Sequence, residues 1–152
     1  MKPENETFDV AYLLLSGTTT AARGPELLRG LRGLGFTTVL ALPTPNAARV
    51  IAARELADVP GVQVVESYFD LAIRPRPPRG VVLFAPCGFN SLNKLAHGIA
   101  DSLALSVAAE AIGRGTPVIV VPPVDDGAGP RLAPSARLLE AARPFARPRA
   151  ER

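Results

Sequence analysis

Short apolar runs alternate with amphipathic stretches along most of this chain. The apolar runs at 10–15, 37–42, 62–65, 80–85 and 117–121 have the length and composition of buried strands. Leucines recur at helical spacing over 27–34, with Pro25 before them and Gly35 after them, as is typical of a helix start and end. The pattern therefore predicts strands that alternate with helices.

Further helices are expected between the later strands. Thr44, Pro45 and Asn46 can cap a second helix that runs to about Asp58. A short helix is expected over 91–96, and an alanine-rich one over 102–112 with Asp101 or Ser102 as its cap. A last helix over 132–142 would turn Leu138 and Leu139 inward. The proline-rich segment 73–78 should be an exposed loop.

Alternation of this kind is typical of a doubly wound α/β fold. Parallel strands need helical crossovers, so a sheet of about five or six strands would be covered on both faces, giving three layers of the Rossmann-like or flavodoxin-like kind. Ligands of such sheets bind at the carboxyl ends of the strands, where the strand order reverses. The loops at 16–20, 43–46 and 86–93 are therefore the candidate site.

Composition limits the alternatives. The chain has 152 residues, of which 47% are hydrophobic and 20% charged, so we expect one domain over 1–142 and a flexible basic tail over 143–152. One cysteine and one histidine exclude an intramolecular disulfide and a closed four-ligand zinc site.

Charge and hydropathy add expectations about partners and location. The net charge of +3 reflects arginines at 74–79 and 143–152, without the interleaved aromatic residues of a nucleic-acid surface, so no nucleic acid is expected. The apolar run at 80–86 is too short to span a membrane, and residues 1–9 do not form a secretory signal. We expect no membrane association and a cytoplasmic location.

The first candidate loop is rich in hydroxyl groups. Ser16, Gly17 and three threonines precede a helix, an arrangement that suits phosphate oxygens, although an ordinary strand-to-helix turn fits equally well. The loop matches neither GxGxxG nor the P-loop pattern. Thr44 and Asn46 either add donors to the same anion or cap the second helix.

Residues 85–103 carry the most specific pattern. The stretch APCGFNSLNKLAHGIADSL resembles the flavin-binding signature of the homo-oligomeric flavin-containing cysteine decarboxylases, whose typical form is PASANT followed by KxAxGxxD-(N/S)-L. This family includes phosphopantothenoylcysteine decarboxylases and decarboxylases of peptide natural products. The matching positions are Pro86, Asn90, Lys94, Ala96, Gly98, Asp101, Ser102 and Leu103.

The resemblance implies a flavin site, with FMN expected and FAD as the alternative. Ser16, Thr18 and Thr44 would hold the phosphate, and the loops at Asn90 and 101–104 would border the ring. The complete expected set of cofactor-binding residues is Ser16, Gly17, Thr18, Thr44, Asn46, Pro86, Cys87, Gly88, Phe89, Asn90, Asp101, Ser102, Leu103 and Ala104. The family also implies homo-oligomers, as trimers or dodecamers built from trimers, with flavin at the subunit boundary.

The implied reaction is oxidative decarboxylation of a cysteine. Oxidation of the cysteine to a thioaldehyde lets the adjacent carboxylate leave as carbon dioxide, and the cofactor carries the difficult step. Asn90 would orient the carboxylate through its amide, the alternative being an N-cap of the short helix. Where the family has a catalytic histidine this chain has Tyr68, a poorer base that can still donate a hydrogen bond, so Asn90 and Tyr68 are the expected catalytic residues.

Other departures point away from pantothenate metabolism. The family motif PxMNxxMW is replaced by a Gly- and Pro-rich segment at 122–130, which is either a clamp over the site, extending to about 135, or an exposed connection. Cys87 is interpreted as a packed thiol near the flavin, with a redox role as the alternative, and His97 as a structural or interface residue.

These features favour oxidative decarboxylation of a C-terminal peptide cysteine to an enethiol. The alternatives are another flavin enzyme, such as a reductase or a prenyl-transferring relative, and a flavin-binding subunit without catalysis, because the usual histidine is absent and a fold does not fix chemistry.

Overall fold

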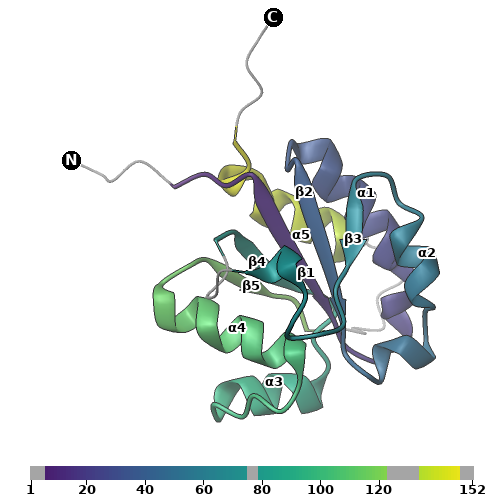
Figure 1. Cartoon of the computed structure of the whole chain (residues 1–152), viewed down its shortest axis with the longest axis vertical. Coiled ribbons are helices and arrows are strands. Elements are labelled where there is room, and N and C mark those ends of the chain that lie inside the picture. Colours follow the sequence, from purple (N-terminus) through teal and green to yellow (C-terminus); the bar gives the residue numbers. More distant parts are fainter. Residues whose placement is uncertain (1–5, 75–78, 123–133, 148–152) are drawn as a thin grey trace, which may run out of the picture.

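A parallel sheet of five strands forms the centre of the molecule (Figure 1). The computed structural model describes residues 6–74, 79–122 and 134–147. The strands are β1 (Val10–Leu15), β2 (Thr38–Pro43), β3 (Val62–Val64), β4 (Val81–Phe84) and β5 (Val118–Val120), in the spatial order β3-β2-β1-β4-β5. This confirms the predicted doubly wound α/β fold. The strand order reverses between β1 and β4, so the carboxyl ends of these two neighbours form the switch point.

Alternating side chains divide the core into two layers, one on each face of the sheet. In β1, Leu13 and Leu15 point to one layer, whereas Tyr12 and Leu14 point to the other. Every one of these four side chains is at most 5% exposed. Strands buried on both faces explain why the sequence showed continuous apolar runs rather than strict alternation with polar residues.

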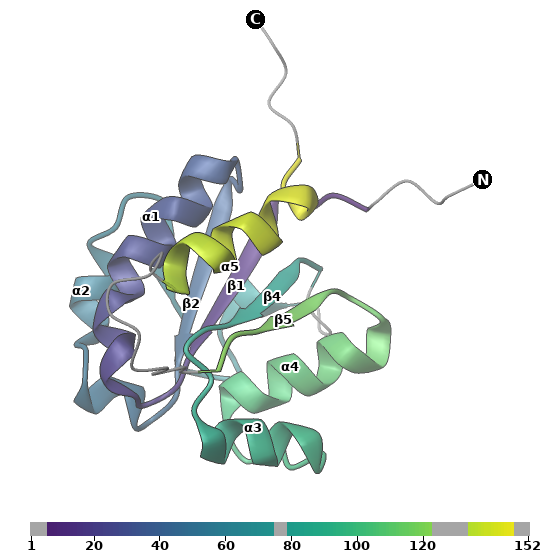
Figure 2. The same ribbon diagram turned by 180° about the vertical axis from the view of Figure 1, so that it is seen from behind.

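Helices cover both faces (Figures 1 and 2). Helices α1 (Gly24–Leu34) and α5 (Pro134–Ala142) pack on one face, where Leu28, Leu31 and Leu138 join the same core layer. Helix α4 (Leu103–Arg114) packs on the opposite face through Leu105, Val107 and Ala108, and α3 (Phe89–Ala96) lies beside it. The sequence predicted all four helices. Gly35 ends α1 with a φ of 115°, as its position suggested.

The predicted second helix over 44–58 was wrong, because this segment is broken. A 3-10 turn at Ala47–Arg49 is separated from α2 (Ala53–Ala57) by extended backbone at Ala52. The N–H of Ala52 donates a hydrogen bond to the Glu55 carboxylate at 3.2 Å, so a local cap replaces the helical bond there. The break lets Ile51 bury its side chain in the core.

Residues 143–147 also differ from the expected flexible tail. A 3-10 turn at Arg143–Phe145 follows α5, and Ala146 forms an isolated parallel bridge with Phe8. The guanidinium of Arg147 pairs with the Asp9 carboxylate at 2.9 Å. The remaining tail, 148–152, lies outside the described residues, as do most of the proposed clamp at 122–135 and the part of the proline-rich loop at 75–78.

Candidate ligand-binding site

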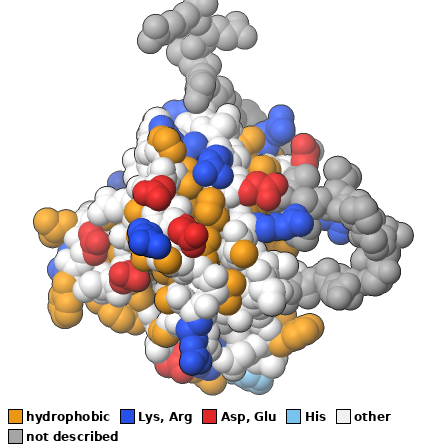
Figure 3. Space-filling view, turned by 90° about the vertical axis from the view of Figure 1, so that its right-hand side faces the viewer, with side chains coloured by type: hydrophobic (Ala, Val, Ile, Leu, Met, Phe, Trp, Pro, Cys, Tyr) orange, Lys and Arg blue, Asp and Glu red, His pale blue; other side chains and the backbone are white. Residues whose placement is uncertain are grey.

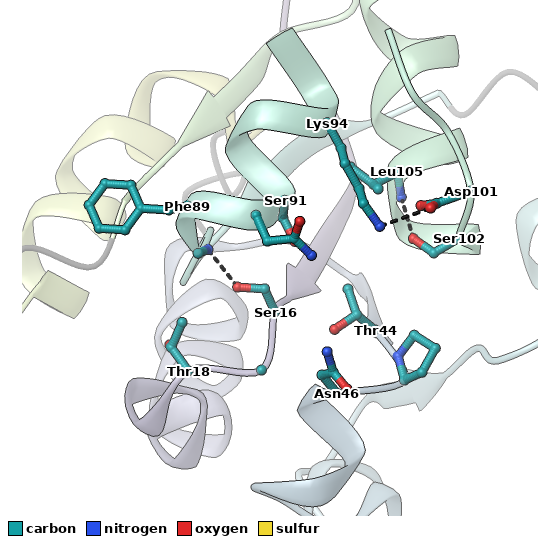
Figure 4. A pocket seen from close by; sticks show the side chains of 14 residues that line it. Ser16, Thr18, Thr44, Asn46, Phe89, Ser91, Lys94, Asp101, Ser102 and Leu105 are labelled. Carbon is teal, nitrogen blue, oxygen red and sulfur yellow. Dashed lines mark hydrogen bonds and ion pairs between the residues drawn. The ribbon is translucent and has the colours of Figure 1, made fainter. Parts of the chain in front are cut away.

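A cavity of about 360 Å³ opens at the carboxyl ends of the strands. All three loops selected from the sequence contribute to it, and the start of α4 closes one side (Figure 4). The volume is in the range of small-molecule sites. The lining residues are Ser16, Gly17, Thr18, Thr44, Pro45, Asn46, Gly88, Phe89, Asn90, Ser91, Lys94, Asp101, Ser102 and Leu105.

Ser16 joins the loop after β1 to the loop after β4. Its hydroxyl donates to the Pro86 carbonyl at 2.8 Å and accepts from the Gly88 N–H at 2.7 Å, while its own N–H donates to the same Pro86 carbonyl at 3.0 Å. The side chain is only 3% exposed. Because its single proton is directed to Pro86, Ser16 holds the start of α3 in this arrangement rather than offering a donor to an anion.

Gly17 allows the loops after β1 and β2 to touch. A Cβ atom added there would lie 2.5 Å from the Asn46 Cβ and 2.8 Å from the Asn46 carbonyl carbon. Neither neighbour is the flexible end of a side chain, so a larger residue would push the two loops apart. The glycine in this loop is therefore explained by backbone approach.

Thr44 contributes a buried hydroxyl to the cavity. Its side chain is 8% exposed, and its Oγ1 accepts a hydrogen bond from the Ala47 N–H at 3.3 Å. Among the described residues, the hydroxyl proton has no acceptor. A buried donor without a partner is costly, and a ligand oxygen in the cavity would satisfy it. The Thr44 hydroxyl therefore accepts a capping hydrogen bond from the following turn and still has a proton to donate into the cavity. Helix capping and anion binding, the two roles considered from the sequence, are thus compatible.

Asn90 is the second residue of α3 and does not cap it. The N-cap position is occupied by Gly88, and no side chain caps the helix there, so the interpretation of Asn90 as an N-cap was wrong. The Asn90 amide makes no hydrogen bond within the described part of the chain, and it lines the cavity. Lys94 lies one turn further along the same helix, which places it on the same face.

Two charged side chains, Lys94 and Asp101, meet at the cavity wall. The Lys94 Nζ lies 2.8 Å from the Asp101 Oδ2 (Figure 4). The next residue, Ser102, is the N-cap of α4, and its hydroxyl accepts from the Leu105 N–H at 3.3 Å. Of the two caps considered for this helix, Ser102 is the one observed.

Ten of the predicted site residues line the cavity and five do not. Pro86 and Cys87 lie just behind it, and Leu103 and Ala104 pack into the core from the first turn of α4. Cys87 is fully buried, and burial raises the pKa of its thiol from 9.0 to about 11. A thiol that holds its proton so firmly is a poor nucleophile, which agrees with the interpretation of Cys87 as a packed residue.

Tyr68 and Phe89 do not face the cavity in the way expected of them. The Tyr68 hydroxyl makes a 2.5 Å hydrogen bond with Ser106 on α4, and the side chain is absent from the cavity wall. Phe89 is at the rim, but the residue is 70% exposed and its ring points away from the other labelled side chains (Figure 4). His97, the only histidine, is exposed at the end of α3.

Four lining residues were absent from the predicted set: Pro45, Ser91, Lys94 and Leu105. The four-residue interval from Asn90 to Lys94 is a signal that could have identified Lys94, because both fall on one helix face. Leu105 lies three residues after the Ser102 cap, so helical spacing also places it on the same side of α4 as Ser102. Within the described ranges, there is no group of three or more His, Cys, Asp or Glu side chains able to hold a metal, and no helix is long and apolar enough to span a membrane.

Comparison with known families gives one match over most of the chain. Residues 2–126 match the model of the family described as Flavoprotein. A flavin prenyltransferase UbiX from Deinococcus radiodurans is 32% identical over 114 residues, which cover 70% of this chain. The chain spans 58% of the length of that relative.

Solved structures show the same fold at lower identity. The FMN-dependent cysteine decarboxylase TvaF from thioviridamide biosynthesis matches with a TM-score of 0.67 and 23% identity, over 88% of this chain and 84% of TvaF. A dodecameric FMN-dependent UbiX-like decarboxylase from Escherichia coli O157:H7 matches with a TM-score of 0.64 and 19% identity, over 90% of this chain and 77% of that chain.

Proposed function

Because this chain belongs to the flavoprotein family, we propose that its cavity binds FMN and that the protein oxidatively decarboxylates the C-terminal cysteine of a peptide. The observation that carries the proposal is the convergence of Thr18, Thr44 and Asn90 on one cavity at the switch point of the sheet. The solved neighbour TvaF, an FMN-dependent cysteine decarboxylase, supports the choice of reaction.

The donor set fits the phosphate of FMN. Thr44 has a buried hydroxyl proton without an acceptor in the described residues, and Thr18 and Asn46 lie beside it in the cavity wall. Hydroxyl and amide groups donate to phosphate oxygens without a change in their own charge. Thr18, Thr44 and Asn46 would therefore hold the phosphate, while Ser16 keeps the neighbouring loops in place.

Asn90 suits the carboxylate of the substrate. A neutral amide can orient a carboxylate by hydrogen bonding without the strong ground-state stabilisation that a free cation would give. That difference favours catalysis, because the negative charge leaves the carboxylate as carbon dioxide forms. When bound, FMN would supply the two-electron oxidation that prepares the cysteine for loss of carbon dioxide.

Prenyl transfer is the second candidate. The flavin prenyltransferase from Deinococcus radiodurans is 32% identical to this chain over the matched residues, which is a specific observation in its favour. A prenyl-transferring enzyme would change the mass of its flavin, whereas a cysteine decarboxylase would change the mass of the peptide. The two candidates therefore differ in which molecule is modified.

The test is mass spectrometry after incubation of the FMN-loaded protein with a set of peptides that end in cysteine. We expect a product that has lost two hydrogens and one carbon dioxide, and no such product from peptides that end in serine. Asn90→Asp, which places a negative charge against the carboxylate, should abolish the product while FMN remains bound. An unchanged peptide together with a prenylated flavin, formed from an allylic prenyl phosphate, would replace decarboxylation by prenyl transfer.

A further inference from the structure

The cavity wall holds one cation and one anion among the described residues. These are Lys94 and Asp101, and they are paired with each other at 2.8 Å. The other lining side chains are neutral: hydroxyls, amides and apolar groups. The formal charges of the described wall therefore sum to zero, and the ion pair places the positive charge directly beside the carboxylate.

The fold brings this pair together at a chain reversal. Lys94 is in the last turn of α3, and Asp101 immediately precedes the N-cap of α4. Between them, Gly98 adopts a φ of 71°, and the Ile99 N–H donates to the Lys94 carbonyl at 2.8 Å. The backbone thus fixes where the carboxylate meets the cavity, and the N-terminus of α4 adds a favourable field there.

An anionic ligand conflicts with Asp101 unless its charge is cancelled. A phosphate bound in this cavity would share it with the Asp101 carboxylate, and charges that face each other inside a cavity are screened by salt less than charges on the open surface. A proton on Asp101 would cancel the charge at the cost of an acceptor. A neighbouring cation cancels it and leaves the carboxylate able to accept hydrogen bonds.

We propose that Lys94 is a charge-compensating residue, which neutralises Asp101 so that the cavity can hold a phosphate ester that also carries hydroxyl groups. The inference rests on the proposed binding of FMN, which has both features. Lys94 binds Oδ2, and Oδ1 of Asp101 has no partner within the described residues, so Oδ1 can accept from a ligand hydroxyl. Lys94 does not contact the phosphate in this account; it removes a repulsion.

The test compares FMN with riboflavin, which has the same ring and hydroxyl groups but no phosphate. Binding of each is measured by flavin fluorescence titration at low salt. Lys94→Met should weaken FMN binding by about tenfold and riboflavin binding by less than about twofold, since the unpaired carboxylate repels only the phosphate. Lys94→Met with Asp101→Asn should restore most of the FMN affinity. Arg114→Met removes the same charge at the far end of α4, roughly 17 Å along the helix, and should change neither affinity.

Three results would overturn the inference while leaving FMN binding established. Equal loss of both flavins in Lys94→Met would mean that the pair only maintains structure. A double variant as weak as Lys94→Met would mean that Lys94 itself binds the phosphate. Unchanged FMN affinity in Lys94→Met would mean that Asp101 needs no compensation. A wild-type protein that binds neither flavin contradicts the proposed function, and this inference with it.

Discussion

Thr44 is the residue whose local chemistry indicates a ligand most clearly. Its hydroxyl is buried at the cavity, accepts from the turn that follows, and has a proton left to donate. We predict that Thr44→Val lowers FMN affinity by about tenfold or more, the size expected for a lost hydrogen bond to a charged group. Thr44→Ser keeps the hydroxyl and should bind nearly as well. Flavin fluorescence titration checks both, and equal affinity in wild type and Thr44→Val would contradict the role.

Cys87 gives a prediction about pH. Burial raises its thiol pKa from 9.0 to about 11, so the folded state keeps a proton that the unfolded chain releases. The stability linked to this group is complete below pH 9 and is lost as the pH rises toward 11, by up to about 1.4 kcal/mol per pH unit. Tyr12, whose pKa burial also raises, changes stability in the same direction.

A comparison with Cys87→Ala isolates the thiol. Urea unfolding at pH 8.5 and 10.5 should show a smaller loss of unfolding free energy in Cys87→Ala than in the wild-type protein, by about 1–2 kcal/mol. Tyr12 is present in both proteins and cancels from the comparison. An identical loss in the two proteins would show that the thiol titrates normally in the folded state.

At the scale of elements, the sequence predicted the strands well and the second helix poorly. Apolar runs bounded by turn residues fixed all five strands, and Gly35 and Ser102 marked helix ends through their own backbone or side-chain chemistry. The break at Ala52 depends on a hydrogen bond from its N–H to the Glu55 carboxylate and on burial of Ile51, and such contacts leave no periodic pattern in the sequence.

The position of the site could be predicted from the sequence, but the directions of its side chains could not. Parallel strands place their carboxyl ends at one edge, so the three loops could be selected before their geometry was known. The direction in which each side chain points depends on tertiary contacts, which the sequence pattern does not show. The Ser16 hydroxyl points to Pro86, the Phe89 ring turns outward, and Tyr68 bonds to Ser106 on α4.

The contact between the loops after β1 and β2 gives a prediction at this scale. Gly17→Ala places a methyl group against the backbone of Asn46, so we expect a loss of about 1–3 kcal/mol in unfolding free energy, as for overpacked sites. Gly33→Ala is the matched control, because a Cβ there meets nothing within 4 Å and lies in α1. It should be neutral or stabilise by up to about 1 kcal/mol. Denaturant unfolding measures both, and equal effects of the two substitutions would contradict the steric argument.

At the scale of the whole molecule, the distribution of exposed apolar side chains bears on assembly. Acidic and basic side chains are interspersed on the face shown in Figure 3. By contrast, Phe69 and Leu71 are 79% and 82% exposed, close together in the chain beside Tyr68. Exposed apolar side chains that form a contiguous patch, rather than single ones, are typical of interaction surfaces. We propose that this segment lies at a contact between copies of the chain.

This proposal predicts a homo-oligomer in solution. Light scattering coupled to size-exclusion chromatography should give a mass of at least a trimer at micromolar concentration. Phe69→Glu combined with Leu71→Glu should shift the protein toward the monomer, since two charges would be buried without partners. Val50→Glu, at a 38% exposed apolar position near the loop after β2, provides a control for added charge. A monomeric wild-type protein would contradict the prediction.

The central claim is that the cavity at the switch point binds FMN. The most direct measurement is the absorbance spectrum of the purified protein, followed by mass identification of any cofactor that heat releases. The account predicts oxidised-flavin bands and the mass of FMN, with both strongly reduced in Thr44→Val. A colourless protein that takes up neither added FMN nor added FAD would contradict it.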